Sequence, residues 1–157
     1  MVAMFFSFPL TALAANAGTA APSFNLEDLN GSSVTLEQFK GKVVFLDFWG
    51  TWCAPCKEEM PELDKLYNKY RKEGFEVIGV SINGSRPDIE KFLQKVPVGF
   101  HILIDDKDRA GDAYRVSSLP VGFIIGKDGI IRHKHMGFGS EFLPMYEKEI
   151  IELLKQK

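Results

Sequence analysis

Cysteine is scarce in this sequence: the 157 residues include only Cys53 and Cys56. A structural zinc site takes four ligands, and no second cysteine pair is present to complete one. Two cysteines are also too few for the disulfide framework of a small secreted scaffold. Lys57 stands where a haem-attachment motif requires histidine, so covalent haem is excluded. A catalytic role for the pair is therefore favoured over a structural one.

The sequence also lacks a surplus of positive charge, with 19 Lys and Arg against 21 Asp and Glu. Nucleic-acid binding has no electrostatic support and is not expected. No motif for a nicotinamide or flavin is present, so no cofactor is expected beyond the cysteine pair. His133 and His135 could face one side of a strand as metal ligands, but no acidic or thiol residue is near them in sequence. We predict no metal site and a surface position for both.

No charged side chain precedes Glu27. Residues 4–13 form a short apolar stretch that is followed by small residues, a pattern typical of a secretory signal. We predict a signal peptide over residues 1–17, cleaved near Ala14 or Ala17. A transmembrane helix is not expected, because the stretch is too short to span a bilayer well. Export to the periplasm, or to another extracytoplasmic side of the bacterial envelope, is the expected location. A disordered leader or a cytoplasmic protein is the alternative.

Residues 22–157 predict a single domain in which apolar runs alternate with helical patterns. Asn30-Gly31 is a strong turn signal between two short strands, which predicts an N-terminal β-hairpin. Further strands are expected over 42–49, 75–82, 101–105, 121–125 and 130–135, and helices over 54–73, 88–95, 110–114 and 141–155. This order predicts an α/β fold, with a mixed sheet and helices on both faces.

The motif Trp52-Cys53-Ala54-Pro55-Cys56-Lys57 stands between a buried strand and a helix. A helix N-terminus stabilises a thiolate by its free N–H groups and positive partial charge. A second cysteine one helical turn on can close a disulfide with the first and release a trapped partner. The spacing therefore indicates thiol–disulfide chemistry.

With the run Asp47 to Lys57 (Asp-Phe-Trp-Gly-Thr-Trp-Cys-Ala-Pro-Cys-Lys) the sequence resembles the thioredoxin-fold proteins. It is most similar to the TlpA/ResA-like thiol–disulfide oxidoreductases of the bacterial envelope. The similarity extends from about Pro22 to the C-terminus and includes Ser117-Ser118-Leu119-Pro120 before a strand. It implies a thioredoxin fold with a central mixed sheet, helices on both faces and an added N-terminal hairpin.

The resemblance also implies a site. Leu119–Pro120 is expected to be a cis peptide bond that faces the cysteines, in a groove where the Leu119 backbone pairs with an extended substrate. The residues expected to contact substrate are Trp52, Ala54, Pro55, Leu119, Pro120 and Gly137. Many relatives carry a buried Glu where Gly84 stands here, and often Asn in place of Asp47. The residue after Pro120, usually Thr, is Val121.

Cys53 is expected to attack the partner disulfide and Cys56 to resolve the mixed disulfide. Asp47, buried under the motif, is the predicted base for Cys56, because burial raises the pKa of a carboxyl group toward neutral pH. The alternative is a structural carboxylate. Glu58 and Glu59 are expected on a solvated helix face. Lys57 is expected to be solvated or to help the thiolate, Trp49 to pack in the core and Trp52 to line the groove.

The favoured function is an exported, monomeric reductase of protein disulfides, with apocytochrome c cysteines as a substrate implied by the resemblance. Pro55 favours a reductant, since a histidine there would make the disulfide more oxidising. Such a protein needs a membrane electron donor of the thiol–disulfide type.

Three alternatives remain. One is a disulfide oxidase or isomerase. Another is a thiol peroxidase, because residues 21–26 and 41–44 also resemble peroxiredoxins, although the spacing upstream of Cys53 does not match that chemistry. The third is a non-enzymatic binding module.

Overall fold

The computed structural model describes residues 15–157. Most of the predicted signal peptide, residues 1–14, lies outside the described residues. Within residues 15–157, no helix is both long enough and apolar enough to cross a membrane.

A single seven-stranded sheet, ordered β2-β1-β5-β4-β3-β6-β7, forms the centre of the domain. The strands are β1 (Asn25–Asp28), β2 (Ser33–Thr35), β3 (Val43–Trp49), β4 (Phe75–Ile82), β5 (His101–Asp105), β6 (Val121–Ile125) and β7 (Ile131–Met136). β3, β4 and β5 run parallel, and all other neighbours pair antiparallel. The sheet is therefore mixed, and β1 with β2 is the predicted hairpin.

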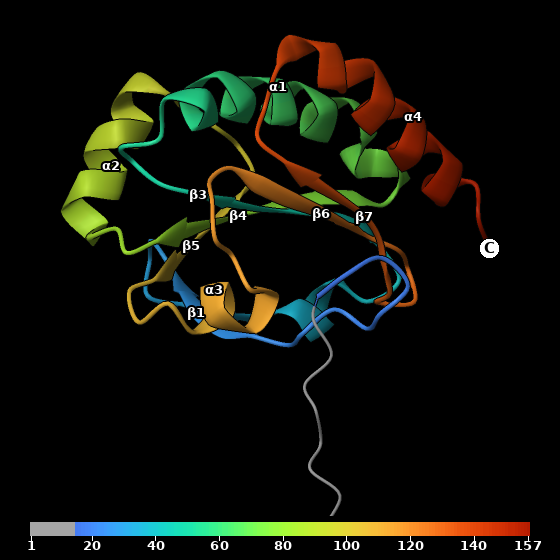
Figure 1. The fold of residues 1–157 in the computed structure, drawn as a ribbon, viewed down its shortest axis with the longest axis horizontal. Helices are drawn as coiled ribbons and strands as arrows, with labels where there is room; N and C mark the ends of the chain where they lie inside the picture. Colours follow the sequence, from blue (N-terminus) through green and yellow to red (C-terminus); the bar gives the residue numbers. More distant parts are fainter. Residues whose placement is uncertain (1–14) are drawn as a thin grey trace, which may run out of the picture.

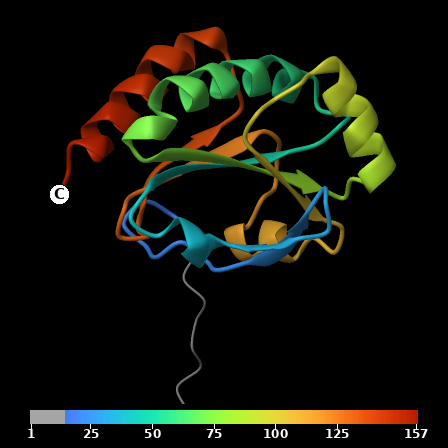
Figure 2. The same ribbon diagram turned by 180° about the vertical axis from the view of Figure 1, so that it is seen from behind.

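Helices cover both faces of the sheet (Figures 1 and 2). The longer helices α1 (Ala54–Tyr70), α2 (Arg86–Lys95) and α4 (Leu143–Leu154) lie on one face, and α3 (Arg109–Tyr114) lies on the other. Short 3-10 turns span η1 (Leu36–Phe39), η2 (Arg71–Glu73) and η3 (Ser140–Phe142). The predicted fold class is confirmed, while the last turn of the helix expected over 54–73 is the 3-10 turn η2.

Strand β3 is buried along its whole length because both its faces are covered. Successive side chains of a strand point to opposite faces. Phe45 and Trp49 belong to the core under α1, α2 and α4, and Leu46 and Phe48 belong to the core on the α3 face. By this alternation Asp47 faces the α1 side, beneath the cysteine motif.

Helix α4 packs on the same face through Tyr146, Ile150 and Leu153, which are buried. Met145, by contrast, is 39% exposed. The buried face matters for the site, because it brings the phenol ring of Tyr146 into the core next to α1.

The sheet has two edges, β2 and β7. Residues 18–21 run beside the start of β7, where Gly18 N–H donates to Ile131 O at 2.8 Å and Ile131 N–H donates to Thr19 O at 2.9 Å. Ala15, just before this segment, is 2% exposed and packs in the core on the α3 face. The chain thus contacts the domain from its first described residue.

Candidate active site

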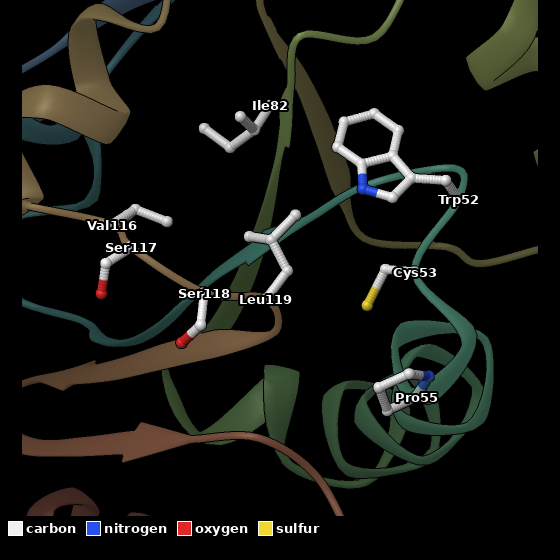
Figure 3. Close-up of a pocket in the computed structure, with 8 residues that line it drawn as sticks. All are labelled: Trp52, Cys53, Pro55, Ile82, Val116, Ser117, Ser118 and Leu119. Atoms are coloured by element: carbon white, nitrogen blue, oxygen red, sulfur yellow. The ribbon is translucent and has the colours of Figure 1, made fainter.

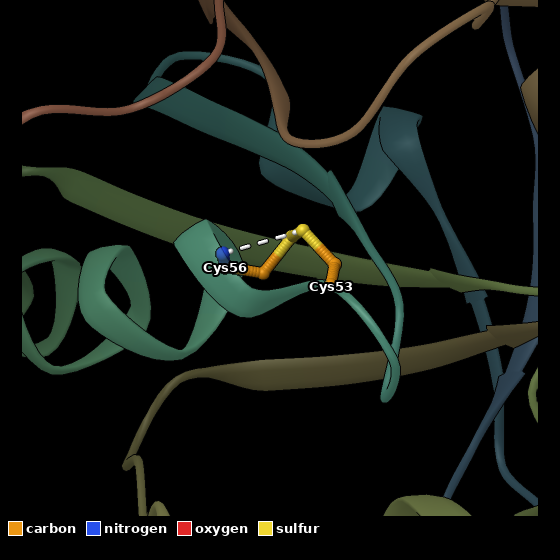
Figure 4. The surroundings of a disulfide bond; sticks show 2 residues. All are labelled: Cys53 and Cys56. Carbon is orange, nitrogen blue, oxygen red and sulfur yellow. Dashed lines mark hydrogen bonds between the residues drawn. A yellow bond between two sulfur atoms is a disulfide. The ribbon is translucent and has the colours of Figure 1, made fainter.

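The two cysteines form a disulfide at the first turn of α1 (Figure 4). The strand ends at Trp49, and a turn follows in which Cys53 N–H donates to Gly50 O at 3.1 Å. Cys53 is the N-cap residue of α1, and its sulfur accepts the backbone N–H of Cys56 at 3.3 Å. Cys53 is 7% exposed and Cys56 is fully buried. The backbone N–H groups of the helix start therefore point at Cys53, where a thiolate would be stabilised after reduction.

A groove of about 410 Å³ opens at Cys53 (Figure 3). Its lining residues are Trp52, Cys53, Pro55, Ile82, Val116, Ser117, Ser118 and Leu119. Trp52 is 61% exposed and forms one rim, and the sulfur of Cys53 points toward the side formed by Leu119 (Figure 3). The lining carries no charged side chain. This arrangement suits an uncharged peptide segment around a reactive cysteine.

The predicted substrate contacts fall into two sets. Trp52, Pro55 and Leu119 line the groove, as expected, whereas Ala54, Pro120 and Gly137 do not. Ala54 is exposed in the first turn of α1. The Leu119–Pro120 bond is cis, as the resemblance implies.

Pro120 and Gly137 are joined to each other by a backbone hydrogen bond. Pro120 is buried, and its carbonyl accepts the N–H of Gly137 at 2.9 Å. Gly137 has φ +74°, a left-handed conformation that favours glycine. Sequence reasoning did not assign Ile82, Val116, Ser117 or Ser118 to the groove, because they reach it only through the tertiary fold.

Asp47 is fully buried, and neither of its carboxyl oxygens has a hydrogen-bond partner within the described chain. Burial raises the pKa of this carboxyl group well above its usual range. The predicted burial of Asp47 under the motif is thus confirmed, while its role as a base stays a prediction.

Glu59 is a second buried carboxyl group beside Asp47, and its expected place on a solvated helix face is wrong. It is 1% exposed, whereas its neighbour Glu58 is exposed. Burial raises the pKa of Glu59, and the charge of Asp47 raises it further. A sequence signal for this position existed: Glu59 follows Cys56 by three residues and precedes Leu63 by four, on the buried stripe of α1.

Tyr146 of α4 supplies the hydrogen bond that Glu59 receives. Its hydroxyl group donates to Glu59 Oε1 at 3.3 Å, and Glu59 Oε2 has no partner among the described residues. The ring of Tyr146 is held by Phe45 and His135, with centroids 5.2 and 4.7 Å away. Helix α4 therefore contacts Glu59 through Tyr146. Glu59 Oε2 and both carboxyl oxygens of Asp47 have no hydrogen-bond partner among the described residues.

At Gly84, where the resemblance implies a buried acid, a side chain would displace neighbouring atoms. A Cβ atom at Gly84 would come within 2.5 Å of Ser81 Oγ. The buried acid that accompanies Asp47 comes instead from α1, as Glu59.

His133 and His135 have an acidic partner that sequence proximity did not reveal. Glu149 of α4 lies 3.2 Å from His133 Nδ1 and 2.7 Å from His135 Nε2. Both histidines are partly exposed, and their pairing with Glu149 places them at the contact between β7 and α4. Among residues 15–157 no group of His, Cys, Asp or Glu has an arrangement that could hold a metal ion. The cluster joins β7 to α4.

Comparisons with known proteins agree with this geometry. Residues 17–134 match the model of the AhpC/TSA family. The thiol–disulfide oxidoreductase ResA of Geobacillus kaustophilus is 43% identical over 115 residues, which cover 73% of this chain and 66% of that protein. ResA of Halalkalibacterium halodurans is 40% identical over 141 residues, which cover 90% of this chain and 78% of that protein. The chain thus spans from about two thirds to three quarters of the length of these relatives.

Solved structures show the same fold. A structure described as a thiol:disulfide interchange protein DsbE from Chlorobium tepidum has a TM-score of 0.86 and 33% identity, and covers 90% of this chain and 99% of its own. The thioredoxin domain of a thiol–disulfide oxidoreductase from Bacteroides vulgatus has a TM-score of 0.77 and 30% identity, with 85% and 97% covered. The thioredoxin fold is therefore established.

Proposed function

The chain belongs to the AhpC/TSA family and is a ResA-like thiol–disulfide oxidoreductase, and from this we propose that it is an exported reductase of protein disulfides. The observation that carries the proposal is the Cys53–Cys56 disulfide, placed at a helix start and opening onto an uncharged groove. A groove of this size accepts a peptide segment, which favours protein substrates over small disulfides.

The reaction needs the cysteine pair in its reduced state. The Cys53 thiolate attacks one sulfur of the partner disulfide, a mixed disulfide forms, and the other partner sulfur leaves as a thiolate that takes up a proton. The Cys56 thiol then loses its proton and attacks Cys53 Sγ. This forms the Cys53–Cys56 disulfide and releases the second partner thiol. Two electrons pass from the protein to its partner.

Asp47 and Glu59 are suited to exchange the proton of Cys56. Two neighbouring buried carboxyl groups do not both ionise readily, so the pair holds a proton near neutral pH. The ionised member accepts the proton from Cys56, and the pair returns a proton when the disulfide is reduced again.

Four further points of the proposal rest on the sequence. The apolar segment within residues 1–17 supports export to the periplasm or another extracytoplasmic side of the bacterial envelope, and the family resemblance supports apocytochrome c cysteines as substrate. Re-reduction then requires a membrane protein that donates a thiol pair. No segment of the described chain was identified as a dimerisation element, and we propose a monomer.

The direction of electron flow is tested by the reduction potential of the cysteine pair. The protein is equilibrated with defined thiol/disulfide buffers, and the emission of Trp49 and Trp52 reports its redox state. We expect a value between about −270 and about −220 mV, as for a reductant. A value above about −180 mV would assign an oxidase or isomerase instead, and would contradict the inference from Pro55.

A thiol peroxidase is the second candidate, favoured by the resemblance of residues 21–26 and 41–44 to peroxiredoxins. Peroxidase chemistry requires Pro-x-x-x-Thr/Ser-x-x-Cys, and Gly50 occupies the Thr/Ser position before Cys53. We expect no thiol-dependent consumption of hydrogen peroxide. Turnover that depends on Cys53 would favour this candidate.

A further inference from the structure

A second hollow, of about 270 Å³, lies beside the active-site turn and shares no lining residue with the substrate groove. It is lined by Thr51, Lys57, Asp88, Lys91, Phe92, Lys95 and Val96. Thr51 and Lys57 stand directly before Trp52 and directly after Cys56 in the chain. The hollow therefore lies between the cysteine motif and α2, next to the place where a partner protein must approach.

Three lysines give this hollow its charge. Within residues 15–157, the ammonium groups of Lys57, Lys91 and Lys95 have no hydrogen-bond or ion-pair partner, whereas Lys42 and Lys69 each pair with a glutamate at 2.6 Å. Lys91 and Lys95 are four residues apart on α2, a spacing at which like charges destabilise a helix. Lys95 lies in the last turn of α2, where a positive charge is favourable, but the like charge of Lys91 opposes it.

One carboxylate faces the lysines, but it is already engaged. Asp88 Oδ2 accepts the hydroxyl group of Ser85 at 2.5 Å, and Ser85 Oγ in turn accepts the N–H of Asp88 at 3.3 Å, which caps α2. The lining thus carries three positive charges and one negative charge in a chain whose net charge is −2. The positive field is local to the neighbourhood of the cysteines.

The floor of the hollow is apolar and fixed. Phe92 is 7% exposed and packs on Trp49 with ring centroids 4.9 Å apart, and Val96 is half-buried beside it. An apolar floor with a cationic rim matches a peptide segment that carries carboxylates around an apolar side chain.

We propose that the hollow rimmed by Lys57, Lys91 and Lys95 docks an acidic segment of the protein that exchanges disulfides with Cys53. This inference rests on the proposed function and adds the chemistry of the partner. The partner's cysteine enters the uncharged groove at Leu119, while its carboxylates lie on the lysines at the other side of the motif. Opposite charges at this place speed encounter and orient the partner before the thiolate attacks.

Two synthetic peptides test the proposal. Both contain the same intramolecular disulfide, and they differ only in four flanking residues, which are Glu in one and Lys in the other. The reduced protein is mixed with each peptide, and quenched samples give the rate constant of peptide reduction at low and at high salt. We expect the Glu peptide to react about tenfold faster at low ionic strength, and the difference to shrink strongly at about 0.5 M salt.

Two double variants locate the effect. Lys91→Glu with Lys95→Glu should reverse the preference, because the rim becomes negative. The control variant combines Lys72→Glu, just beyond the opposite end of α1, with Lys155→Glu, at the end of α4. It changes the net charge by the same amount and should keep the preference for the Glu peptide. An unchanged reduction potential in both variants shows that the cysteine site is intact.

The outcomes separate the two proposals. Equal rates for the two peptides with the wild-type protein, or equal effects of the two double variants, would overturn the docking surface and leave the reductase standing. Failure to reduce either peptide would overturn the reductase, and the docking surface with it.

Discussion

Tyr146 and Tyr114 are fully buried tyrosines on opposite faces of the sheet, and their hydroxyl groups have different tasks. Tyr146 donates to the carboxyl group of Glu59 at 3.3 Å, whereas Tyr114 donates to the backbone carbonyl of Pro22 at 2.8 Å. The first hydrogen bond acts on a titrating group and the second only on packing. This difference gives a matched pair for the first prediction.

Tyr146→Phe should raise the pKa of Glu59, because the hydrogen bond from Tyr146 favours the ionised carboxylate. Carbon-13 NMR of the glutamate carboxyl carbons across a pH titration measures the midpoint directly. Tyr114→Phe should leave that midpoint in place, although each variant loses about 1 kcal/mol of stability. A Glu59 midpoint that moves equally in both variants, or in neither, would contradict the assigned role of Tyr146.

The stability of the oxidised protein should fall as pH rises from about 5 through neutrality. The folded pKa values of Asp47 and Glu59 are raised, so the folded protein retains protons that the unfolded chain has released. The stabilising contribution is complete below the unfolded pKa values and is lost as pH rises through the folded ones. Urea unfolding at a series of pH values should give a slope of about −1.4 kcal/mol per pH unit for each proton that only the folded protein retains.

Glu59→Gln should flatten this slope, since the variant side chain does not titrate. Glu58→Gln, its exposed neighbour on α1, is the matched control and should change the slope little. An unfolding free energy that increases over this pH range in the wild type would exclude the raised pKa values.

The two cysteines should differ when each is replaced by serine. Cys53→Ser removes the attacking sulfur, so no covalent complex with a disulfide peptide should form. In Cys56→Ser, Cys53 can still attack the peptide disulfide, but no second thiol can resolve the product. A mixed disulfide between Cys53 and the peptide should therefore accumulate. Non-reducing mass spectrometry distinguishes the two. Trapping at Cys56 in the Cys53→Ser variant would reverse the assignment.

Gly122→Ala should cost about 1–3 kcal/mol of stability, because there is no space for a Cβ atom on this strand. The atom would lie 2.6 Å from Cε1 of Phe45, a fully buried ring that itself contacts Tyr146. Gly99→Ala is the control, since its Cβ would meet only Asp64 Oδ1 at 3.5 Å. Thermal unfolding of both variants should therefore show a lower melting temperature for Gly122→Ala alone.

The sequence predicts the strands best where burial is two-sided. The expected ranges 75–82, 101–105 and 121–125 coincide with β4, β5 and β6. A short continuous apolar run bounded by turn residues is typical of a strand that is buried on both faces. The cysteine motif was equally clear, since it depends on spacing along the chain. The face that α4 buries follows from its contacts, because Tyr146 packs on Phe45 and His135 while the apolar Met145 is exposed.

The polar part of the site was harder to predict. Glu59 was placed on a solvated face because a charged residue is rarely buried, although its spacing from Cys56 put it on the inner stripe of α1. Glu149 is distant in sequence from His133, and only the packing of α4 on β7 brings them together. Groove residues such as Ile82, at the end of β4, and Val116, after α3, come from separate parts of the chain and carry no shared motif.

The two ends of the sheet offer a neighbouring chain little to pair with. At one end β2 is only three residues long, so an added strand would gain few hydrogen bonds. At the other edge residues 18–21 already occupy the start of β7, and Lys134 places a positive charge farther along, while Arg132 is paired with Asp128. A second copy of β7 laid alongside would meet the same charge. The seven-stranded sheet is thus protected at both edges against edge-to-edge aggregation.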